Sequence, residues 1–296
     1  MGGIKTLVTE DIWARWLTYR RQGGSTLSPE LEKQLHGLRD RVLALASIKD
    51  GDTVLDVGCG DGLIGFGALD RVGPPGHVIF SDISADLLGR CKATAEGIGA
   101  ADRCRFLLAP ADDLRDVPTA SVDVVTTRSV LIYVSAKSRA LAEFFRVLKA
   151  SGRAAIAEPI NRYCFPEPAG TLFGYDVRPI ANLAARIADR YDQVETPQIA
   201  AMLDFDERDL VTMAERAGFA EIHLDLRIDI EASGPVDWTT FARQAGNPLS
   251  PTLEEAMESV LSPSEREQVT AYLKPLVESG AGTTRSAFAF MSALKQ

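Results

Sequence analysis

Residues 54–62 read VLDVGCGDG, a short apolar strand that runs directly into a loop with glycine at every second position. Glycines at this spacing let the backbone turn tightly and let a ligand lie against bare amide groups. Alone, such a loop is a weak signal, because nicotinamide- and flavin-binding folds use one too. A second acid sharpens it: Asp82 ends the next strand, about twenty residues past the loop, where a ribose diol is bound in such folds.

The spacing of the glycines and the acid that precedes them narrow the ligand. Diphosphate-binding loops more often read GxGxxG, whereas this loop reads GxGxG. Asp56 ends the strand just before the glycines, where a positively charged ligand group can be held. An acid here disfavours a diphosphate and favours a cationic cofactor with an amino acid moiety.

Around this loop, short apolar segments alternate with amphipathic ones. The pattern predicts strands at 53–57, 78–80, 105–108, 122–125 and 154–157, and helices near 62–71, 85–98 and 137–149. Strand–helix alternation with short connections predicts an α/β fold with a parallel sheet and helices on both faces. After residue 158 the rhythm breaks. It resumes with a helix at about 207–217, an edge-like strand at 221–230 and a final strand at 286–291.

These segments divide the chain into one sheet domain and a helical cap. We expect the sheet domain to comprise residues 48–158, 206–230 and 285–296. The expected cap comprises an N-terminal helical lid at 1–47 and two insertions, at 159–205 and 231–284. Insertions of this length predict an enclosed pocket with a lid that excludes water.

The composition excludes several classes of partner. Among 296 residues, 41 are acidic and 32 basic, a formal net charge of −9, and such a surface repels nucleic-acid phosphates. We find no run of the roughly 18–20 apolar residues that a membrane span needs and no secretory pattern, and so expect no membrane partner. Without a CxxC pair, the cysteines predict no metal site and a reducing, cytoplasmic location; they are Cys59, Cys91, Cys104 and Cys164.

The sequence resembles the class I S-adenosylmethionine-dependent methyltransferases over about residues 48–160. Within that family it is similar to the branch of ubiquinone/menaquinone and small-molecule methyltransferases. The resemblance rests on VLDVGCGDG at 54–62, VIFSDIS at 78–84, SVDVVTTRSVLIYV at 121–134 and FRVLKASGR at 145–153. It implies a Rossmann-like sheet with an antiparallel closing strand, S-adenosylmethionine as cofactor and S-adenosylhomocysteine as product.

The resemblance also implies a set of cofactor-binding residues: Asp56, Gly58, Cys59, Gly60, Asp82, Ile83, Ala111, Asp112, Arg128 and Ser129. In this family the glycine loop holds the methionine part, Asp82 binds both ribose hydroxyls and Ile83 packs on the adenine. Where the family has an acid on the adenine amine, this chain has Pro110. The role is therefore assigned to the Ala111 backbone and to Asp112.

Methyl transfer from a sulfonium is an in-line displacement, so alignment and desolvation supply much of the acceleration. A base is needed only if the acceptor must lose a proton. Tyr133 and Glu158 follow the fourth and fifth strands, whose carboxyl ends meet at the expected site, and are the candidate catalytic residues. Alternatively, Tyr133 packs under the following helix, and Glu158 caps a neighbouring amide or pairs with an arginine of the cap.

Aromatic residues of the cap are candidates for the substrate pocket. Phe165, Phe173 and Tyr175 lie in the Pro-rich first insertion, which must fold over the end of the fifth strand. Tyr19 lies on the first helix and is a further candidate, whereas for Trp16 on the same helix we favour core packing.

These observations predict methyl transfer to an O, N or C atom of a small organic acceptor, aromatic or from secondary metabolism, by a monomer or homodimer. Three alternatives stay open. An arsenite methyltransferase needs several converging thiolates, and only Cys164 is placed to reach a substrate. A nicotinamide-dependent oxidoreductase is disfavoured by the position of Asp56. The third alternative is a module that binds the cofactor without turnover or uses it for other chemistry.

Overall fold

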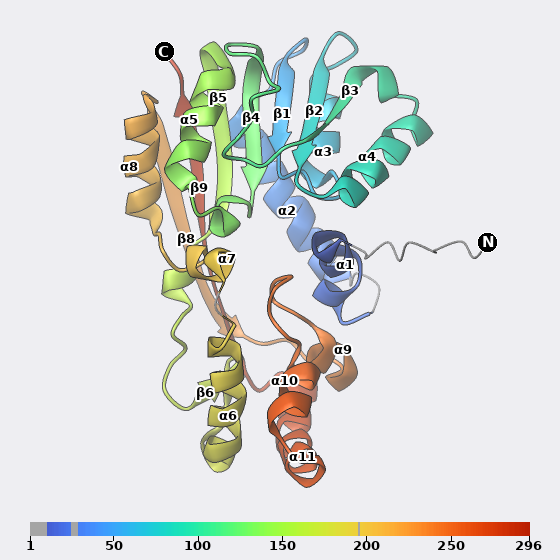
Figure 1. Ribbon diagram of the computed structural model, residues 1–296, viewed down its shortest axis with the longest axis vertical. Coiled ribbons are helices and arrows are strands. Elements are labelled where there is room, and N and C mark those ends of the chain that lie inside the picture. Colours follow the sequence, from blue (N-terminus) through green and yellow to red (C-terminus); the bar gives the residue numbers. More distant parts are fainter. Residues whose placement is uncertain (1–10, 25–28, 195) are drawn as a thin grey trace, which may run out of the picture.

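The computed structural model describes residues 11–24, 29–194 and 196–296. Its main feature is a sheet of seven strands in the order β3-β2-β1-β4-β5-β9-β8 (Figure 1). The strands are β1 (Thr53–Val57), β2 (His77–Asp82), β3 (Cys104–Leu108), β4 (Val122–Arg128), β5 (Leu148–Pro159), β8 (Ile222–Ala232) and β9 (Thr283–Leu294). The first five strands are parallel, and β9 runs antiparallel to both β5 and β8. The predicted Rossmann-like sheet with an antiparallel closing strand is confirmed.

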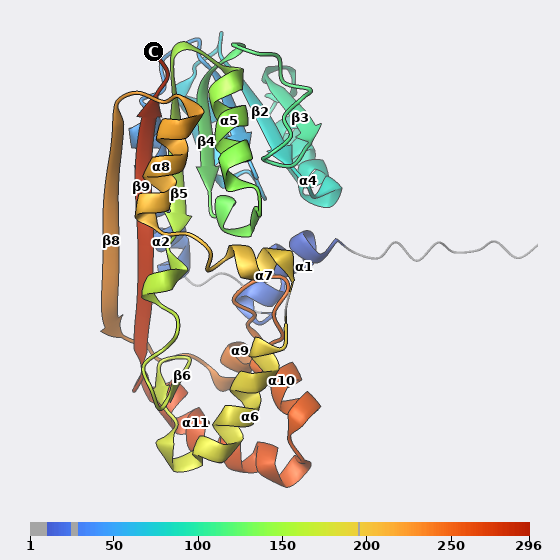
Figure 2. The same cartoon turned by 60° about the vertical axis from the view of Figure 1, so that its left-hand side comes forward.

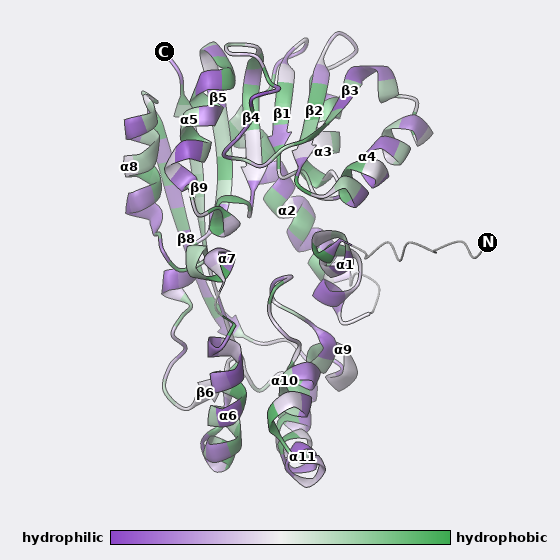
Figure 3. Ribbon diagram, in the orientation of Figure 1, coloured by the Kyte–Doolittle hydropathy of each residue, from purple (hydrophilic) through white to green (hydrophobic). Residues whose placement is uncertain are grey.

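Helices cover both faces of the sheet, as the sequence pattern predicts. One face carries α2 (Pro29–Ala46), α3 (Leu63–Arg71) and α4 (Ala85–Gly97), and the other carries α5 (Lys137–Val147) and α8 (Glu207–Ala217). Figure 3 shows the central strands as largely hydrophobic, whereas α5 and α8 carry hydrophilic stripes. This arrangement buries the strands between two apolar layers and leaves the carboxyl ends of β1, β2, β4 and β5 at one edge.

Parts of the two predicted insertions pack against each other in a separate lobe, which we call the cap lobe. It contains β6 (Thr171–Leu172), β7 (Tyr175–Asp176), α6 (Ala181–Asp192), α9 (Trp238–Arg243), α10 (Leu253–Val260) and α11 (Pro263–Ser279). The lobe has its own hydrophobic core, with Ile187, Met257 and Leu273 buried in it. Figure 2 shows β8 and β9 running on beyond the other strands to reach this lobe. The two long strands therefore connect the cap lobe to the sheet.

The N-terminal segment, α1 (Ile12–Thr18) and the short helix η1 (Arg20–Gln22), bridges the sheet and the cap lobe. The Trp16 indole N–H donates a hydrogen bond to the Ala245 carbonyl at 2.8 Å, and the Ala245 N–H donates to the Arg20 carbonyl at 3.0 Å. The Arg20 guanidinium binds both carboxylate oxygens of Glu255, at 3.0 and 2.7 Å. These contacts hold α1 across the carboxyl edge of the sheet.

A second covering element, α7 (Pro197–Ala201), packs on the short helix η3 (Leu131–Tyr133) that follows β4. Lys137 fastens it. Its buried ammonium group donates to the Ala201 carbonyl at 2.8 Å and pairs with Asp204 at 2.6 Å. The carboxyl edge of the sheet is thus covered by α1 and α7, with the first half of α2 beside them.

Candidate active site

A cavity of about 740 Å³ opens at the carboxyl ends of the parallel strands, within the roughly 300–1,000 Å³ typical of small-molecule sites. Its two sides come from different parts of the chain. The sheet wall consists of the loops after β1, β2, β3 and β4 with η3. The lid wall consists of α1, η1, α2, α7 and residues 246–249. Of the ten predicted cofactor-binding residues, eight line this cavity: Gly58, Gly60, Asp82, Ile83, Ala111, Asp112, Arg128 and Ser129.

The glycine loop presents bare backbone to the cavity. Gly58 and Gly60 adopt left-handed conformations, with φ of 65° and 57°, which glycine reaches without steric cost. A Cβ atom on Gly58 would overlap the side chain of Val130. The Cys59 N–H donates to the Ser81 carbonyl at 2.9 Å and holds the loop against β2. The Cys59 side chain is buried and does not line the cavity.

Asp56 does not face the cavity, contrary to the expectation from the sequence. Its side chain is 1% exposed, and its carboxylate accepts hydrogen bonds from the Gly65 N–H and the Thr126 hydroxyl, both at 2.9 Å. Burial raises the pKa of Asp56 to about 7. These two hydrogen bonds connect β1 to β4 and to the first turn of α3. Because both donors are buried, they depend on this carboxylate as their acceptor and not on water. Its contacts are those of a structural group.

Asp82 does face the cavity, and its position is fixed. One carboxylate oxygen accepts from the Gly60 N–H and the other from the Ser84 N–H, both at 2.9 Å. Burial raises the pKa of Asp82, although the hydrogen bonds from these backbone donors lower it in part. Each oxygen retains acceptor capacity, so the group can accept two further hydrogen bonds from a diol. Beside it, Ile83 is 52% exposed and gives the cavity an apolar surface.

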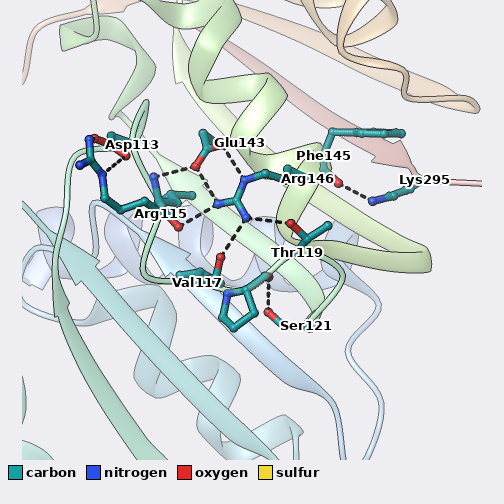
Figure 4. Close-up of polar contacts among 11 residues, drawn as sticks. Asp113, Arg115, Val117, Thr119, Ser121, Glu143, Phe145, Arg146 and Lys295 are labelled. Carbon is teal, nitrogen blue, oxygen red and sulfur yellow. Dashed lines mark hydrogen bonds and ion pairs between the residues drawn. The ribbon is translucent and has the colours of Figure 1, made fainter.

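The loop after β3, which carries Ala111 and Asp112, is clamped from α5 (Figure 4). Glu143 accepts a hydrogen bond from the Leu114 N–H at 2.8 Å, and Arg146 donates to the Leu114 carbonyl at 2.8 Å. Arg146 also donates to the Val117 carbonyl at 3.0 Å and pairs with Glu143. The clamp fixes this loop without using the Asp112 carboxylate.

Glu158, one of the two candidate catalytic residues, is turned away from the cavity. It is fully buried, and its carboxylate accepts from three successive backbone N–H groups, those of Val130, Leu131 and Ile132, at 2.9, 3.0 and 3.1 Å. Burial raises the pKa of Glu158 to about 7, a value that suits a general base. Its oxygens nevertheless cap the start of η3, and its side chain does not line the cavity. The geometry supports the capping alternative and not a catalytic role.

Tyr133, the other candidate, lines the cavity. Its ring packs edge-on against Trp13, with ring centroids 4.9 Å apart. Burial and the charge of Glu158 raise the pKa of Tyr133 to about 12. The phenol therefore stays protonated near neutral pH, and its hydroxyl has no hydrogen-bond partner among the described residues. Tyr133 is placed to donate a hydrogen bond to a ligand and not to remove a proton.

Ser129 and Arg128 end β4 at the cavity. Ser129 has a left-handed backbone with φ of 55°, and its N–H donates to the Ala157 carbonyl at 2.9 Å. A non-glycine residue in this region costs roughly 1–3 kcal/mol and is often found at functional sites. Arg128 is half-buried, and burial lowers its pKa.

Several lining residues were not predicted from the sequence. Arg21 lines the cavity with its Cζ atom 5.7 Å from the centroid of the Trp16 ring, and burial lowers its pKa. The signal that could have found it is spacing, because Trp13, Leu17 and Arg21 recur every four residues and all three line the cavity. The other unpredicted residues of the lid wall include Gln198, Met202, Gly246 and Leu249.

The four predicted pocket residues are not among those that line this cavity. Phe165 and Phe173 line a second cavity of about 410 Å³ that shares Pro159, Asn161 and Phe288 with the first. Tyr175 is buried in the cap-lobe core, and Tyr19 is 54% exposed at the end of α1. Trp16, assigned to core packing from the sequence, lines the main cavity instead.

The cysteines do not converge on a ligand. Cys59 and Cys91 are buried beside the glycine loop, with Sγ atoms 3.8 and 3.3 Å from the Gly60 carbonyl oxygen. Cys164 lines the second cavity. All four thiols are free, and the described residues contain no group of three metal-ligating side chains. The geometry therefore does not supply the thiolates that an arsenite site needs.

Comparison with known proteins identifies the family. Residues 48–218 match the family described as a methyltransferase domain. The ubiquinone/menaquinone biosynthesis C-methyltransferase UbiE of Xanthomonas campestris pv. campestris is 34% identical over 186 residues, 61% of this chain and 71% of UbiE. Nocamycin O-methyltransferase of Saccharothrix syringae is 30% identical over 67% of this chain and 71% of its own length. The chain belongs to the class I S-adenosylmethionine-dependent methyltransferases.

A shorter match covers the cofactor domain alone. Arsenite methyltransferase of Halobacterium salinarum is 33% identical over 124 residues, which are 42% of this chain but 31% of that protein. The chain thus spans about a third of this relative's length.

Solved structures share the fold. Geranyl diphosphate C-methyltransferase from Streptomyces coelicolor A3(2), crystallised with S-adenosyl-L-homocysteine, matches with a TM-score of 0.52 at 16% identity over 94% of this chain and 84% of its own. The [4+2]-cyclase SpnF matches with a TM-score of 0.51 at 17% identity over 94% and 85%. At these identities the likeness shows the fold alone. No helix in the described ranges has the length and apolar character to cross a bilayer.

Proposed function

We propose that this chain transfers the methyl group of S-adenosylmethionine to an O, N or C atom of a small, largely apolar acceptor and releases S-adenosylhomocysteine. One observation carries the proposal: a single cavity has the fixed carboxylate of Asp82 and the bare glycine loop on one wall and the aromatic side chains of Trp13 and Trp16 on the other. The first wall suits a nucleoside with an amino acid tail, and the second suits an organic acceptor.

The residues of the sheet wall fit S-adenosylmethionine. The carboxylate of Asp82 has free acceptor capacity for the two ribose hydroxyls. Gly58 and Gly60 admit the amino acid part close to the backbone, Ile83 offers an apolar surface to the adenine, and Asp112 faces the same cavity. When bound, the cofactor supplies a methyl group already activated by its sulfonium.

The protein's own contribution is alignment and exclusion of water. The helices α1 and α7, with the first half of α2 beside them, cover the carboxyl edge of the sheet and exclude solvent from the acceptor. Exclusion of water strengthens the polar contacts between the acceptor and the protein. Tyr133 donates a hydrogen bond that orients the acceptor, since its raised pKa keeps the phenol protonated. Glu158 is engaged with backbone amides, so we assign it the positioning of η3 and not proton removal.

We also propose that the acceptor is aromatic or comes from secondary metabolism, and that the protein works in the cytoplasm. Similarity to a quinone methyltransferase and to nocamycin O-methyltransferase supports the first proposal. Four free cysteines support a reducing compartment.

A transfer assay with methyl-labelled S-adenosylmethionine tests this function. Purified protein is incubated with the labelled cofactor and pools of small phenols, quinones and amines, and the products are analysed by mass spectrometry. We expect one labelled methyl group on at least one compound, and none with Asp82→Ala. Cofactor binding without transfer to any pool would favour the use of this fold for other chemistry.

A further inference from the structure

Two arginines line the cavity, one on each wall, without a hydrogen bond or an ion pair to another described residue. Arg21 comes from the lid wall, at the end of the N-terminal segment, and Arg128 comes from the end of β4. Within the described ranges, neither guanidinium has a hydrogen bond or an ion pair. By contrast, Arg20, the neighbour of Arg21 in the chain, forms an ion pair with Glu255. The cavity therefore holds two positive charges that the protein itself does not pair.

The acids closest to these arginines do not neutralise them. The carboxylates of Asp56 and Glu158 act on Arg128 through their charge, but both are already bound by other donors. Asp61 of the glycine loop influences both arginines, yet it is exposed and lies beyond ion-pair distance of either. Burial lowers the pKa of both arginines, and the charge of Arg128 lowers that of Arg21 further. Bringing two like charges together in a half-buried site is unfavourable unless a ligand compensates them.

The cofactor does not compensate both. S-adenosylmethionine has a sulfonium, an ammonium and one carboxylate, so it adds a net positive charge to the cavity. Even where its carboxylate engages one guanidinium, the other is left without an anion. Asp82 and Asp112 also line the cavity, but neither forms an ion pair with these arginines, so an anion on the other molecule in the cavity completes the pairing.

We propose that the methyl acceptor has an anionic oxygen group, a carboxylate or a phosphate, that is bound between Arg21 and Arg128. This inference rests on the proposed function and narrows its acceptor. Planar guanidinium groups bind such oxyanions through paired, charge-assisted hydrogen bonds. The surrounding surface is aromatic, with Trp13, Trp16 and Tyr133 lining the same cavity. The acceptor is therefore an amphipathic acid with a flat apolar body.

Calorimetric titration of the protein loaded with S-adenosylhomocysteine tests this inference. The probes are benzoate, phenyl phosphate and the neutral benzamide, which share one ring. We expect at least one of the two anions to bind about tenfold more tightly than benzamide, a difference of about 1.4 kcal/mol, because charge-assisted hydrogen bonds are stronger than neutral ones. Which anion binds more tightly distinguishes a carboxylate from a phosphate. If neither anion binds more tightly than benzamide, the inference is overturned, and this comparison in the wild-type protein needs no variant to fold.

Variants then assign the preference to the arginines. Arg21→Gln and Arg128→Gln should each abolish the preference for an anion over benzamide. Arg227→Gln, which removes an exposed arginine on β8, should preserve this preference. A preference that survives in both cavity variants overturns the assignment. Circular dichroism and thermal unfolding check that each variant is folded.

A second ligand separates the acceptor's anion from the cofactor's own carboxylate. Methylthioadenosine has the nucleoside and the sulfur but no amino acid. If the arginines serve only the cofactor, both variants weaken binding of S-adenosylhomocysteine but not of methylthioadenosine, and the loaded wild type does not discriminate between benzoate and benzamide. If the wild type binds no S-adenosylhomocysteine at all, it is the proposed function that fails.

Discussion

The sheet wall and the lid wall of the cavity are held in place by different kinds of contact. On the sheet wall, buried carboxylates bind backbone N–H groups: Glu158 accepts from three amides at the start of η3, and Asp82 joins the glycine loop to the start of α4. On the lid wall, segments far apart in the chain meet through a few contacts. Trp16 reaches Ala245, and Arg20 reaches Glu255, 235 residues away.

This difference indicates that the two walls have different roles in binding. A wall built on strand ends and buried hydrogen bonds is rigid and suits a ligand that is always the same, here the cofactor. A wall made of distant segments with part-exposed contacts opens at low cost and is free to vary in shape. We infer that the lid wall admits the acceptor and, together with Tyr133 and Arg128 of the sheet wall, selects it. Variants on each wall test this difference in roles.

The largest effect is expected for Gly58→Ala, in the sheet wall. The new methyl group would overlap Val130, and the alanine would have to keep the left-handed backbone of Gly58. Urea unfolding should therefore show that the free energy of unfolding falls by about 2–4 kcal/mol, and S-adenosylhomocysteine should bind more weakly. The matched control is Gly89→Ala within α4, where no atom lies within 4 Å; it should be neutral or about 0.5–1 kcal/mol more stable. Wild-type stability and affinity in Gly58→Ala would show that the loop is not held rigidly.

Glu158→Gln should cost about 1–3 kcal/mol of unfolding free energy. Its amide retains one acceptor oxygen but turns an NH₂ donor toward a backbone N–H, which is left buried and unpaired. Chemical denaturation measures the loss, with the exposed Glu258→Gln as control. A catalytic base would behave differently: the variant would keep its stability and lose its turnover.

Tyr133→Phe should lower kcat/KM about tenfold for an acceptor found by label transfer, the value of one hydrogen bond of about 1.4 kcal/mol. The pH dependence has a defined sign. Because the pKa of Tyr133 is raised to about 12, the phenol stays a donor through the pH at which an ordinary tyrosine loses its proton. The wild-type rate should therefore show no tyrosine titration near pH 10. A transition near pH 10 that disappears in Tyr133→Phe would contradict the raised pKa, and an unchanged kcat/KM in Tyr133→Phe would contradict the donor role.

The smallest effect is expected for Arg20→Gln, in the lid wall. The side chains of Arg20 and Glu255 are 17% and 47% exposed, so loss of this ion pair should lower the free energy of unfolding by at most about 1 kcal/mol. Hydrogen exchange of residues 244–250 should become faster, while α3 and the affinity for S-adenosylhomocysteine stay unchanged. Arg243→Gln, which breaks the exposed pair with Glu254, serves as the control. Equal exchange in both variants would mean that Arg20 does not hold the lid.

Local pattern predicts the sheet wall well for a physical reason. Strand periodicity and glycine spacing depend on neighbours in the chain, so the strands of the sheet and the glycine loop follow from the sequence and its resemblance to a family. Asp82 was assigned to the site in this way and lines the cavity. Asp56 and Glu158 occupy similar positions at strand ends, but their carboxylates turn inward to backbone donors that belong to other segments. Spacing alone does not show which acid a buried amide will capture.

The lid wall escapes prediction because its contacts are long-range. Leu249 and Met202 enter the cavity through packing of segments that carry no shared pattern. Phe173 and Tyr175 have the composition of pocket residues, yet both pack against Phe241 of the cap lobe. An apolar residue in an insertion is equally suited to a pocket or to a small core, and only the tertiary packing distinguishes them.

One titration tests the central claim most directly, that the sheet wall binds S-adenosylmethionine through Asp82. Calorimetry compares S-adenosylmethionine and S-adenosylhomocysteine binding to the wild type and to Asp82→Ala, with thermal unfolding as a check on the fold. We predict saturable binding to the wild type and at least about 100-fold weaker binding to the variant, since two hydrogen bonds to a charged group are lost. Absence of binding to the folded wild type, or equal affinity in the variant, would contradict the claim.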